Sequence, residues 1–405
     1  MEQQSEKQET KKTILFYSIP AYGHIHSNLY LTGRLARAGF RVIYYATEPY
    51  RAEIEANGGE YRAYPLGGKT IDTSDGNKLL KLYRLILEYT RDMLPELLSE
   101  AAQDKPCHII FDSLALWGRA VGELLSVPSF SFYSIAAIDR IGGRAFFAYA
   151  SGFSCGFLRY AGELPQALRI RRQLGQSYGI RTLGMLPVLM NKGNRNLMGY
   201  SRMFQPGGGK FGENYVFLGP LSPHMKSIRS NDFICPPEKL IYISLGTVFN
   251  RDRELLREIL RQFGRGKGAG FRVVMAWNIE KTDRIPDNFI VRPFVNQKEI
   301  LKHASLFITA GGMNSIHEAL YYGVPCLMCP QQGEQLINAR RFEAMGFGRI
   351  LRKKADLYRE AMAAMALKNS WSWDRRKKAT AVHVSAALNL LERSNTTKEE
   401  RRQGE

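Results

Sequence analysis

One stretch of the chain, residues 305–335, constrains the fold more than any other. It reads SLFITAGGMNSIHEALYYGVPCLMCPQQGEQ. Ser305–Thr309 is a short apolar run that predicts a buried strand, and residues 310–312, Ala-Gly-Gly, form a turn that only small residues tolerate. A helix is expected after this turn and ends at Gly323, before a second apolar strand over Val324–Met328. The stretch is therefore predicted to be a strand, a glycine turn, a helix and a strand.

The glycine turn of this unit is a candidate phosphate seat. Gly311 and Gly312 precede Asn314 and Ser315, where the helix is expected to begin. The first turn of a helix presents unpaired backbone N–H groups and the positive end of the helix dipole, and both attract phosphate. A bare Gly-Gly turn also occurs in α/β proteins for packing alone, so the turn by itself is weak evidence.

The opening of the chain has a similar pattern. Lys12–Ile19 predicts a strand, residues 20–26 a loop, Ser27–Ala38 a helix that stops at Gly39, and Arg41–Ala46 the next strand. Such a unit favours a parallel sheet with helices on both faces.

Further elements extend this first half. Helices are expected over Leu79–Leu98 and Ala115–Leu125, and strands over His108–Phe111, Pro128–Phe132 and Val216–Leu218. Residues 136–199 are rich in Phe, Tyr and Gly, and we interpret them as helical insertions.

The second half repeats the opening of the first. Leu240–Leu245 matches the first strand, Arg253–Phe263 predicts a helix, and Phe271–Trp277 matches the second strand. The proline-rich stretch around residues 219–237 separates the halves. The predicted organisation is a polar, disordered tail (1–11), a first domain (12–221), a linker (222–237), a second domain (238–393) and a disordered tail (394–405). An amphipathic segment over residues 371–391 is expected to form a closing helix.

Composition limits the partners. The 57 basic and 38 acidic residues of the 405-residue chain give a formal net charge of +19. This excess favours an anionic substrate or an anionic membrane surface. No zinc-finger spacing or aromatic RNA-binding pattern accompanies it, so we expect no nucleic-acid partner. The N-terminus is polar and no apolar run is long enough to span a bilayer, which predicts a cytoplasmic protein and leaves a location peripheral to the membrane open as an alternative.

The five scattered cysteines fit a reducing compartment. Cys326 and Cys329 have the CxxC spacing of some metal sites. They lie in a strand-like run, where alternation sends the two side chains to opposite faces, so we interpret them as buried thiols.

Two titratable residues follow predicted strands. His24 lies in a Gly-His turn after the first strand, where a neutral imidazole could take a proton from a hydroxyl. Asp112 lies at another strand end, where it could orient that imidazole. A loop histidine with a purely structural role is the alternative.

Residues 310–335 resemble the sequence signature of a known family. Residues 310–320 read AGGMNSIHEAL, followed by Gly323-Val324-Pro325 and by Glu334-Gln335. This is similar to the donor-site signature of the UDP-glycosyltransferase family (GT1 type) and of its bacterial macrolide-type subgroup, which runs H-G-G-x-N-S-x-x-E-A-L, then G-V-P, then P-x-x-x-D/E-Q. The family also has a catalytic histidine in a Gly-His turn and a partner aspartate, at the positions of His24 and Asp112. The subgroup has asparagine where this chain has His26, whose role the sequence leaves open.

The resemblance implies an α/β protein of the GT-B fold, in which two Rossmann-like domains face a central cleft. It implies a site for a nucleotide-sugar donor. In this site, loops bind the phosphates, an aromatic ring stacks on the base, and polar side chains form hydrogen bonds with the ribose and hexose hydroxyls. These residues are Gly246, Thr247, Phe294, Val295, Gln297, Gly311, Gly312, Asn314, Ser315, Glu318, Glu334 and Gln335.

One position departs from the family pattern, because Ala310 stands where the family has a histidine that donates to the diphosphate. Removing one donor to a developing oxyanion costs about 10²–10³-fold in rate in well-studied enzymes. A slower enzyme, an enzyme in which a nearby basic group substitutes, and a protein without transfer activity are the three alternatives. Since the rest of the signature is present, we favour an active enzyme.

The resemblance therefore predicts an inverting, metal-independent hexosyltransferase with no cofactor. Its co-substrate is expected to be UDP-glucose or a related UDP- or dTDP-hexose, and its acceptor an apolar small molecule such as a macrolide, polyketide or phenolic. Two alternatives stay open. One is a transferase that acts on a lipid at the membrane surface, as the +19 charge and the uncharged run over residues 145–158 would suit. The other is a binding protein without turnover.

Overall fold

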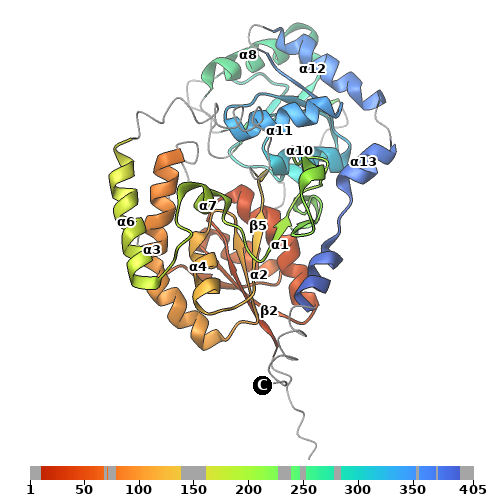
Figure 1. The fold of residues 1–405 in the computed structure, drawn as a ribbon. Coiled ribbons are helices and arrows are strands. Elements are labelled where there is room, and N and C mark those ends of the chain that lie inside the picture. The colour runs from red at the N-terminus through yellow and green to blue at the C-terminus, as the bar shows by residue number, and fades with distance from the viewer. Residues whose placement is uncertain are drawn as a thin grey trace, which may run out of the picture.

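The computed structural model describes residues 11–67, 71, 79–137, 161–226, 239–246, 252–277, 284–352, 355–370 and 373–392. Within these residues the chain forms two α/β domains, one above the other in Figure 1. Several predictions lie outside the described residues: nearly all of both terminal tails, most of the linker, Thr247, and the uncharged run over residues 145–158.

The first domain is built on a seven-stranded sheet whose order is β3-β2-β1-β4-β5-β6-β7 and whose pairings are all parallel. Its strands are β1 Thr13–Tyr17, β2 Arg41–Ala46, β3 Glu60–Ala63, β4 His108–Asp112, β5 Ser129–Tyr133, β6 Arg195–Met198 and β7 Tyr215–Phe217. Helices cover both faces, so side chains on both sides of a strand are buried. Ile14 and Phe16 enter one apolar layer, and Leu15 and Tyr17 enter the other.

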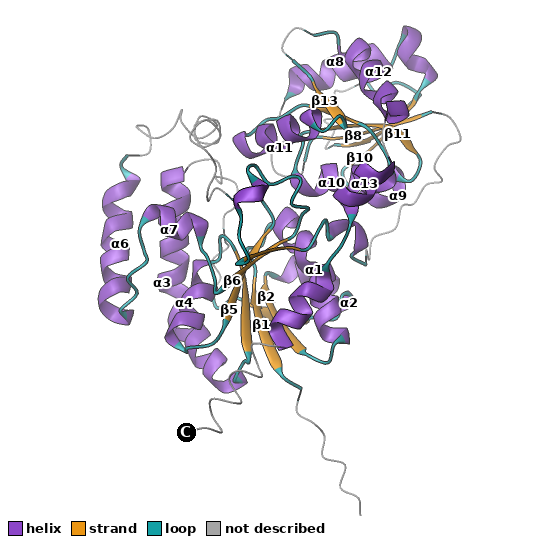
Figure 2. Cartoon of the chain, turned by 45° about the vertical axis from the view of Figure 1, so that its right-hand side comes forward, coloured by secondary structure: helices purple, strands orange, loops and turns teal. Residues whose placement is uncertain are grey.

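The second domain repeats this order in a six-stranded parallel sheet, β10-β9-β8-β11-β12-β13. Its strands are β8 Leu240–Ser244, β9 Arg272–Ala276, β10 Phe289–Arg292, β11 Ala304–Thr309, β12 Cys326–Met328 and β13 Gly348–Ile350. The two groups of strands are separate in Figure 2. The repeat predicted from the sequence is confirmed, since β8 and β9 occupy the same places in this sheet as β1 and β2 in the first.

Helices flank both sheets. In the first domain they are α1 Tyr22–Arg37, α2 Arg51–Ala56, α3 Leu79–Asp104, α4 Leu116–Leu124, α6 Glu163–Tyr178 and α7 Met185–Met190. In the second they are α8 Arg253–Phe263, α9 Gln297–Leu301, α10 Met313–Tyr322, α11 Gly333–Ala344, α12 Leu357–Ala366 and α13 Trp373–Thr380. The predicted helix over Arg253–Phe263 is confirmed, with Asp252 accepting a hydrogen bond from the N–H of Leu255 as its N-cap.

Two predictions in the first domain are wrong. Residues 22–26 are not a loop, because α1 begins at Tyr22 and includes His24 in its first turn. Ser27, which resembles an N-cap, lies inside the helix and donates its hydroxyl proton to the carbonyl of His24, 2.6 Å away. The segment 136–199 contains a strand as well as helices, since β6 adds a sixth parallel strand there.

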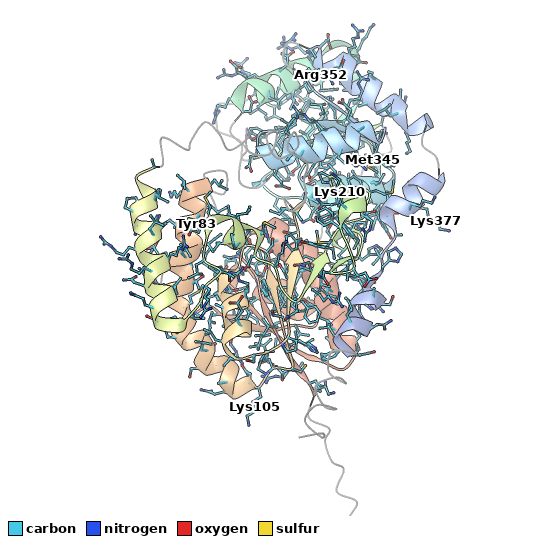
Figure 3. All side chains as sticks on the ribbon, viewed as in Figure 1. Tyr83, Lys105, Lys210, Met345, Arg352 and Lys377 are labelled. Carbon is cyan, nitrogen blue, oxygen red and sulfur yellow. The ribbon has the colours of Figure 1, made fainter. Side chains whose placement is uncertain are left out.

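The two domains meet through a continuous apolar cluster. Residues 198–217 of the first domain contribute Phe204 and Phe211, which belong to the same cluster as Ile316 and Phe342 of the second. In Figure 3, Lys105 and Arg352 mark opposite ends of the molecule, whereas Lys210 lies where the domains meet.

The beginning of the predicted linker is ordered. Residues 222–224 form a 3-10 turn, and the N–H and carbonyl of Lys226 both bond to the side chain of Asn57 in the first domain, at 2.9 and 3.0 Å. The Nζ of Lys298, from α9 of the second domain, donates to the carbonyl of Met225 at 2.7 Å. This turn therefore contacts both domains.

The carboxyl-terminal part of the described chain returns to the first domain, and it is not the single closing helix that the sequence predicts. The guanidinium of Arg376 in α13 donates to the carbonyls of Leu320 and Tyr321 on α10. The helix then breaks at residues 381–383, where the N–H of His383 donates to the carbonyl of Leu218, and residues 384–392 are again helical. Side chains of this last segment enter an apolar layer of the first domain.

Cys326 and Cys329 are buried thiols on opposite faces of the sheet, as predicted. The side chain of Cys326 lies in the apolar cluster on one face of the second sheet, and that of Cys329 lies in the cluster on the other face. Burial raises the pKa of the Cys329 thiol to about 12, and it also raises the pKa of the Cys326 thiol. Both are free thiols.

Candidate functional site

A cleft of about 610 Å³ lies where the carboxyl ends of strands from both sheets converge. Ligands of open parallel sheets bind at this edge because the turns that follow the strands supply the side chains and helix N-termini. The first domain contributes the start of α1, one face of α3 and the residues after β5. The second contributes Gly246, the residues after β10, and the starts of α10 and α11.

His24 and Asp112 form a hydrogen-bonded pair in this cleft, as predicted. The Nδ1 of His24 is 2.7 Å from the Oδ2 of Asp112. Asp112 is fully buried at the end of β4, and its Oδ1 accepts from the N–H of Leu114 at 2.9 Å. His24 is 14% exposed, and its Nε2 has no hydrogen-bond partner among the described residues. A proton on Nδ1 that is shared with Asp112 leaves the lone pair of Nε2 free to accept a proton.

The electrostatic surroundings of His24 favour protonation on balance. Burial alone would lower its pKa, but the negative charge of Asp112, its hydrogen bond, and the charge of Glu334 together raise the pKa above the usual value. The two largest effects on this pKa therefore oppose each other: burial lowers it, and the carboxylate of Asp112, which contacts the ring, raises it. An imidazole with these neighbours is stabilised when it becomes an imidazolium.

Ser134 is a site residue that the sequence analysis missed. It follows β5 directly, is buried, and its Oγ lies 2.9 Å from the Nδ1 of His24. The rule that singled out Asp112, a polar side chain at the carboxyl end of a predicted strand, would also have found it.

His26, whose role the sequence left open, bonds away from the His24–Asp112 pair. Its Nε2 is 2.8 Å from the Oε2 of Glu53, and its ring stacks on Tyr22 with centroids 3.7 Å apart. It borders the cleft, but these contacts fix its ring to α2 and to its own helix.

The predicted phosphate seat is the N-terminus of α10. Gly311 adopts a φ of 85°, a conformation that glycine tolerates best, and Gly312 is the N-cap of the helix without a side-chain cap. The side chains of Asn314 and Ser315 lie in the first turn and line the cleft. The Nδ2 of Asn314 donates to the carbonyl of Gly23 at 2.7 Å. The predicted seat is therefore linked by one hydrogen bond to the first turn of α1, which contains His24.

The remaining donor residues lie on the walls of the same cleft. Gly246 follows β8 with a φ of 99°, and Thr247 lies outside the described residues. The ring of Phe294 is 38% exposed and lines the cleft, which suits a stacking platform, and Val295 behind it is buried. The Nε2 of Gln297 donates to the Oε2 of Glu318 at 2.7 Å, so these two residues interact directly.

Glu334 and Gln335 lie at the start of α11 and also line the cleft. The Oε1 of Glu334 accepts from the Nδ2 of Asn338 at 2.9 Å, and the Oε1 of Gln335 accepts from the N–H of Gln331 at 2.8 Å. Burial raises the pKa of the Glu334 carboxyl, against the opposing effects of Asn338 and His24.

Ala310, the departure from the family pattern, is 2% exposed at the end of β11. It is not among the residues that line the cleft. The structure thus brings together every predicted site residue that it describes in or directly beside one cleft, and leaves position 310 without a polar group.

Part of the first-domain wall of the cleft is apolar. Its apolar wall comes mainly from α3, together with side chains of α4 and α7: Leu79, Leu82, Leu85, Ile86, Tyr89, Trp117 and Leu189. The amphipathic pattern of α3 was visible in the sequence, but periodicity alone does not tell whether such a face meets a core or a cleft.

Within the described ranges, no group of three or more His, Cys, Asp or Glu side chains is arranged to hold a metal ion. Of the helices that the structure describes, none is long and apolar enough to cross a membrane.

Comparisons with known proteins agree with this geometry. Residues 214–370 match the model of the family described as UDP-glucoronosyl and UDP-glucosyl transferase. An NDP-glycosyltransferase of Bacillus licheniformis is 30% identical over 356 residues, which cover 84% of this chain and 85% of that protein. An oleandomycin glycosyltransferase of Streptomyces antibioticus is 25% identical over 88% of this chain and 84% of its own length.

Among solved structures, the glycotransferase of kitacinnamycin superposes with a TM-score of 0.76 at 22% identity, over 95% of this chain and 99% of that chain. This likeness shows the fold, two parallel-sheet domains around a cleft, which is the GT-B arrangement that the sequence predicted. The chain therefore belongs to the family of UDP-glucoronosyl and UDP-glucosyl transferases, and it is a glycosyltransferase with the GT-B fold.

Proposed function

We propose that this glycosyltransferase moves a hexosyl group from a uridine diphosphate sugar to a hydroxyl group of an apolar small molecule, with inversion at the anomeric carbon. One observation carries the proposal. An imidazole that is oriented by a buried carboxylate lies in a cleft, one hydrogen bond from the N-terminus of a helix that can hold a diphosphate.

The proposed reaction follows from this arrangement. The Nε2 of His24 takes the proton of the acceptor hydroxyl, and the acceptor oxygen forms a bond with the anomeric carbon. The bond from that carbon to the diphosphate oxygen breaks, and its electron pair leaves with the nucleoside diphosphate. Asp112 stabilises the imidazolium and keeps its Nδ1 proton in place. Because attack and departure occur on opposite faces, the configuration inverts.

The diphosphate is proposed to bind without a resident metal ion. Backbone N–H groups at Gly312–Ser315 and the positive end of α10 point at the place where the diphosphate would lie. We expect transfer to continue in excess EDTA, whereas a loss of activity that magnesium restores would contradict this part of the proposal.

The donor and acceptor classes rest on different observations. Phe294 offers an exposed ring for a base, and Glu318 offers carboxylate oxygens for ribose hydroxyls. The apolar wall formed by α3 suits an aglycone such as a macrolide, a polyketide or a phenolic. The names of the oleandomycin and kitacinnamycin enzymes point to the same kind of acceptor.

The deciding experiment measures UDP release from UDP-glucose by the purified chain, with and without pooled polyketide and phenolic acceptors. We expect acceptor-dependent release that falls by about 10²–10⁴-fold in His24→Ala. The matched control is His303→Ala, which removes an exposed histidine and should leave the rate unchanged. If UDP binds to the wild type but no acceptor or nucleotide sugar supports turnover, the chain is a binding protein and the proposal is wrong.

A second candidate acceptor is a lipid at an anionic membrane surface. Three of the four large apolar side chains that are exposed among the described residues, Leu164, Leu168 and Leu186, lie on α6 and α7. Arg169 and Arg172 are exposed on α6 beside them, and Figure 1 shows α6 alongside α3, which lines the cleft. Arginine and leucine on one helix face suit anionic headgroups and acyl chains.

This candidate predicts that the protein sediments with phosphatidylglycerol vesicles, less so in high salt, and not with neutral phosphatidylcholine vesicles. Leu168→Ser combined with Arg172→Glu should abolish that sedimentation without changing transfer to a soluble acceptor. If the wild type stays in the supernatant at low salt, the membrane candidate fails and the small-molecule proposal is unaffected.

A further inference from the structure

Because position 310 is alanine, this residue cannot supply a positive charge to the donor diphosphate. Among the described residues that line the cleft there is no lysine and no arginine. Two carboxylates, those of Glu318 and Glu334, line it instead. A bound diphosphate would add further negative charge to this cleft, so a compensating positive charge is needed.

Of the described residues that line the cleft, His24 is the group best placed to supply that charge. It lies in the first turn of α1, and the N-terminus of α10 lies beside this turn, because Asn314 bonds to the carbonyl of Gly23. Two helix N-termini thus converge on one place and create a positive region that attracts anions. The imidazole is at the same place.

The charges around His24 come from several elements. Asp112 contacts it from β4, and Glu334 acts on it from α11. On its own helix, His26 is bonded to Glu53 of α2. Glu318 of α10 is bonded to Gln297. Burial lowers the pKa of His24, but Asp112 and Glu334 together raise it above its usual value, and an arriving diphosphate would raise it further.

We propose that the protonated form of His24 is the counter-charge for the donor diphosphate in this chain, in which position 310 is alanine. The inference rests on the proposed function, in which the same residue acts as the base. The two roles are compatible within one turnover. Neutral His24 takes the acceptor proton, and the imidazolium that forms lies on the acceptor side of the anomeric carbon, from where its charge attracts the departing diphosphate through space while Asp112 holds its other nitrogen.

The test measures binding without turnover. Calorimetry of the full chain with UDP-glucose, from about pH 5.5 to about pH 8, is suited to this because the diphosphate diester does not titrate in that range. We expect the affinity to fall by about tenfold as the pH rises, and we expect proton uptake on binding when two buffers of different ionisation heat are compared. The sign follows from linkage: an anion that raises the pKa of His24 binds more tightly where His24 is protonated.

His24→Gln should remove both the pH dependence and the proton uptake, whereas His303→Gln, which changes an exposed histidine, should keep both. Glu334→Gln is the critical control, because ionisation of Glu334 as the pH rises would also repel the diphosphate. If the pH dependence persists in His24→Gln and disappears in Glu334→Gln, the inference is overturned.

Failure of the inference and failure of the proposed function give different results. Binding of UDP-glucose that is independent of pH, together with acceptor-dependent turnover, would overturn the counter-charge and leave the transferase intact. Absence of binding at every pH, for both UDP-glucose and dTDP-glucose, would overturn the donor assignment and the counter-charge together.

Discussion

The two sides of the cleft differ in which groups form them: side chains on the first-domain side and backbone groups on the second-domain side. On the first-domain side, the proposed base is made from side chains: His24, Asp112 and Ser134 come from the ends of three elements that are distant in sequence. On the second-domain side, the proposed anion seat is made from backbone: a glycine turn and the first turn of α10, all within one short stretch. A side-chain site fails when one functional group is lost. A backbone site is less sensitive to a changed side chain, but it depends on the conformation of its turn.

The largest effect is expected where the side-chain site loses its orienting carboxylate. Asp112→Asn keeps the size of the side chain but removes the charge that holds the Nδ1 proton of His24 and stabilises the imidazolium. We expect kcat to fall by about 10²–10⁴-fold, with a smaller change in the donor KM. Asp287→Asn, which alters an exposed aspartate, is the control. A folded Asp112→Asn enzyme with more than half of the wild-type kcat would contradict the base assignment.

The backbone side can be tested with two adjacent glycines. Gly311 has a φ of 85°, and a Cβ there would lie 3.3 Å from the carbonyl oxygen of Gln335, whereas Gly312 has a φ of −61° and open space around its Cβ position. Gly311→Ala should lower the free energy of unfolding by about 1–2 kcal/mol and weaken donor binding. Gly312→Ala should leave stability unchanged and weaken donor binding only, because its methyl group would meet the diphosphate.

Thermal unfolding and calorimetry with UDP-glucose separate these two outcomes. If both variants bind the donor as tightly as the wild type, the turn is not the diphosphate seat. If both lose stability equally, the difference in backbone conformation between the two positions has no energetic consequence.

The same contrast explains how much could be predicted from the sequence. The proposed phosphate seat is contiguous, so its strand, turn and helix were predicted close to their observed bounds, and the repeated apolar strands predicted the two parallel sheets. The start of α1 was placed five residues too late because its N-cap, Ala21, makes no side-chain cap, whereas Ser27 resembles one. Strand β6 was missed because Arg-Asn-Leu-Met lacks the β-branched and aromatic residues that indicate strands.

Long-range contacts were harder to predict than local structure. The pairing of His24 with Asp112 was predicted only because both follow strands and match a family, and the contact with Ser134 was not predicted at all. The apolar wall from α3 depends on how a long helix packs beside the sheet, which periodicity does not determine. Tertiary packing, rather than local preference, decides such contacts.

A smaller effect is expected where the two sides of the cleft are joined. Asn314→Ala removes the hydrogen bond from the seat to the carbonyl of Gly23. A hydrogen bond of this kind contributes about 0.5–1.5 kcal/mol, so kcat/KM should fall by roughly 2–10-fold. Stability should change little, because the side chain of Asn314 is partly exposed. An unchanged kcat/KM would mean that this contact does not align the base with the donor.

The smallest effect is expected from Ser134, which touches the base but carries no charge. Its hydroxyl lies 2.9 Å from the Nδ1 of His24, which already has the stronger partner Asp112 at 2.7 Å. Ser134→Ala should therefore lower kcat by only about two- to fivefold, within the range expected for one neutral hydrogen bond.

A role in positioning should also shift the acidic limb of the kcat/KM pH profile, because the hydroxyl helps to set the orientation in which His24 meets Asp112. Ser134→Thr, which keeps the hydroxyl, should restore both kcat and the profile. If alanine and threonine give the same profile as serine, Ser134 only fills space behind the imidazole, and the base consists of His24 and Asp112 alone.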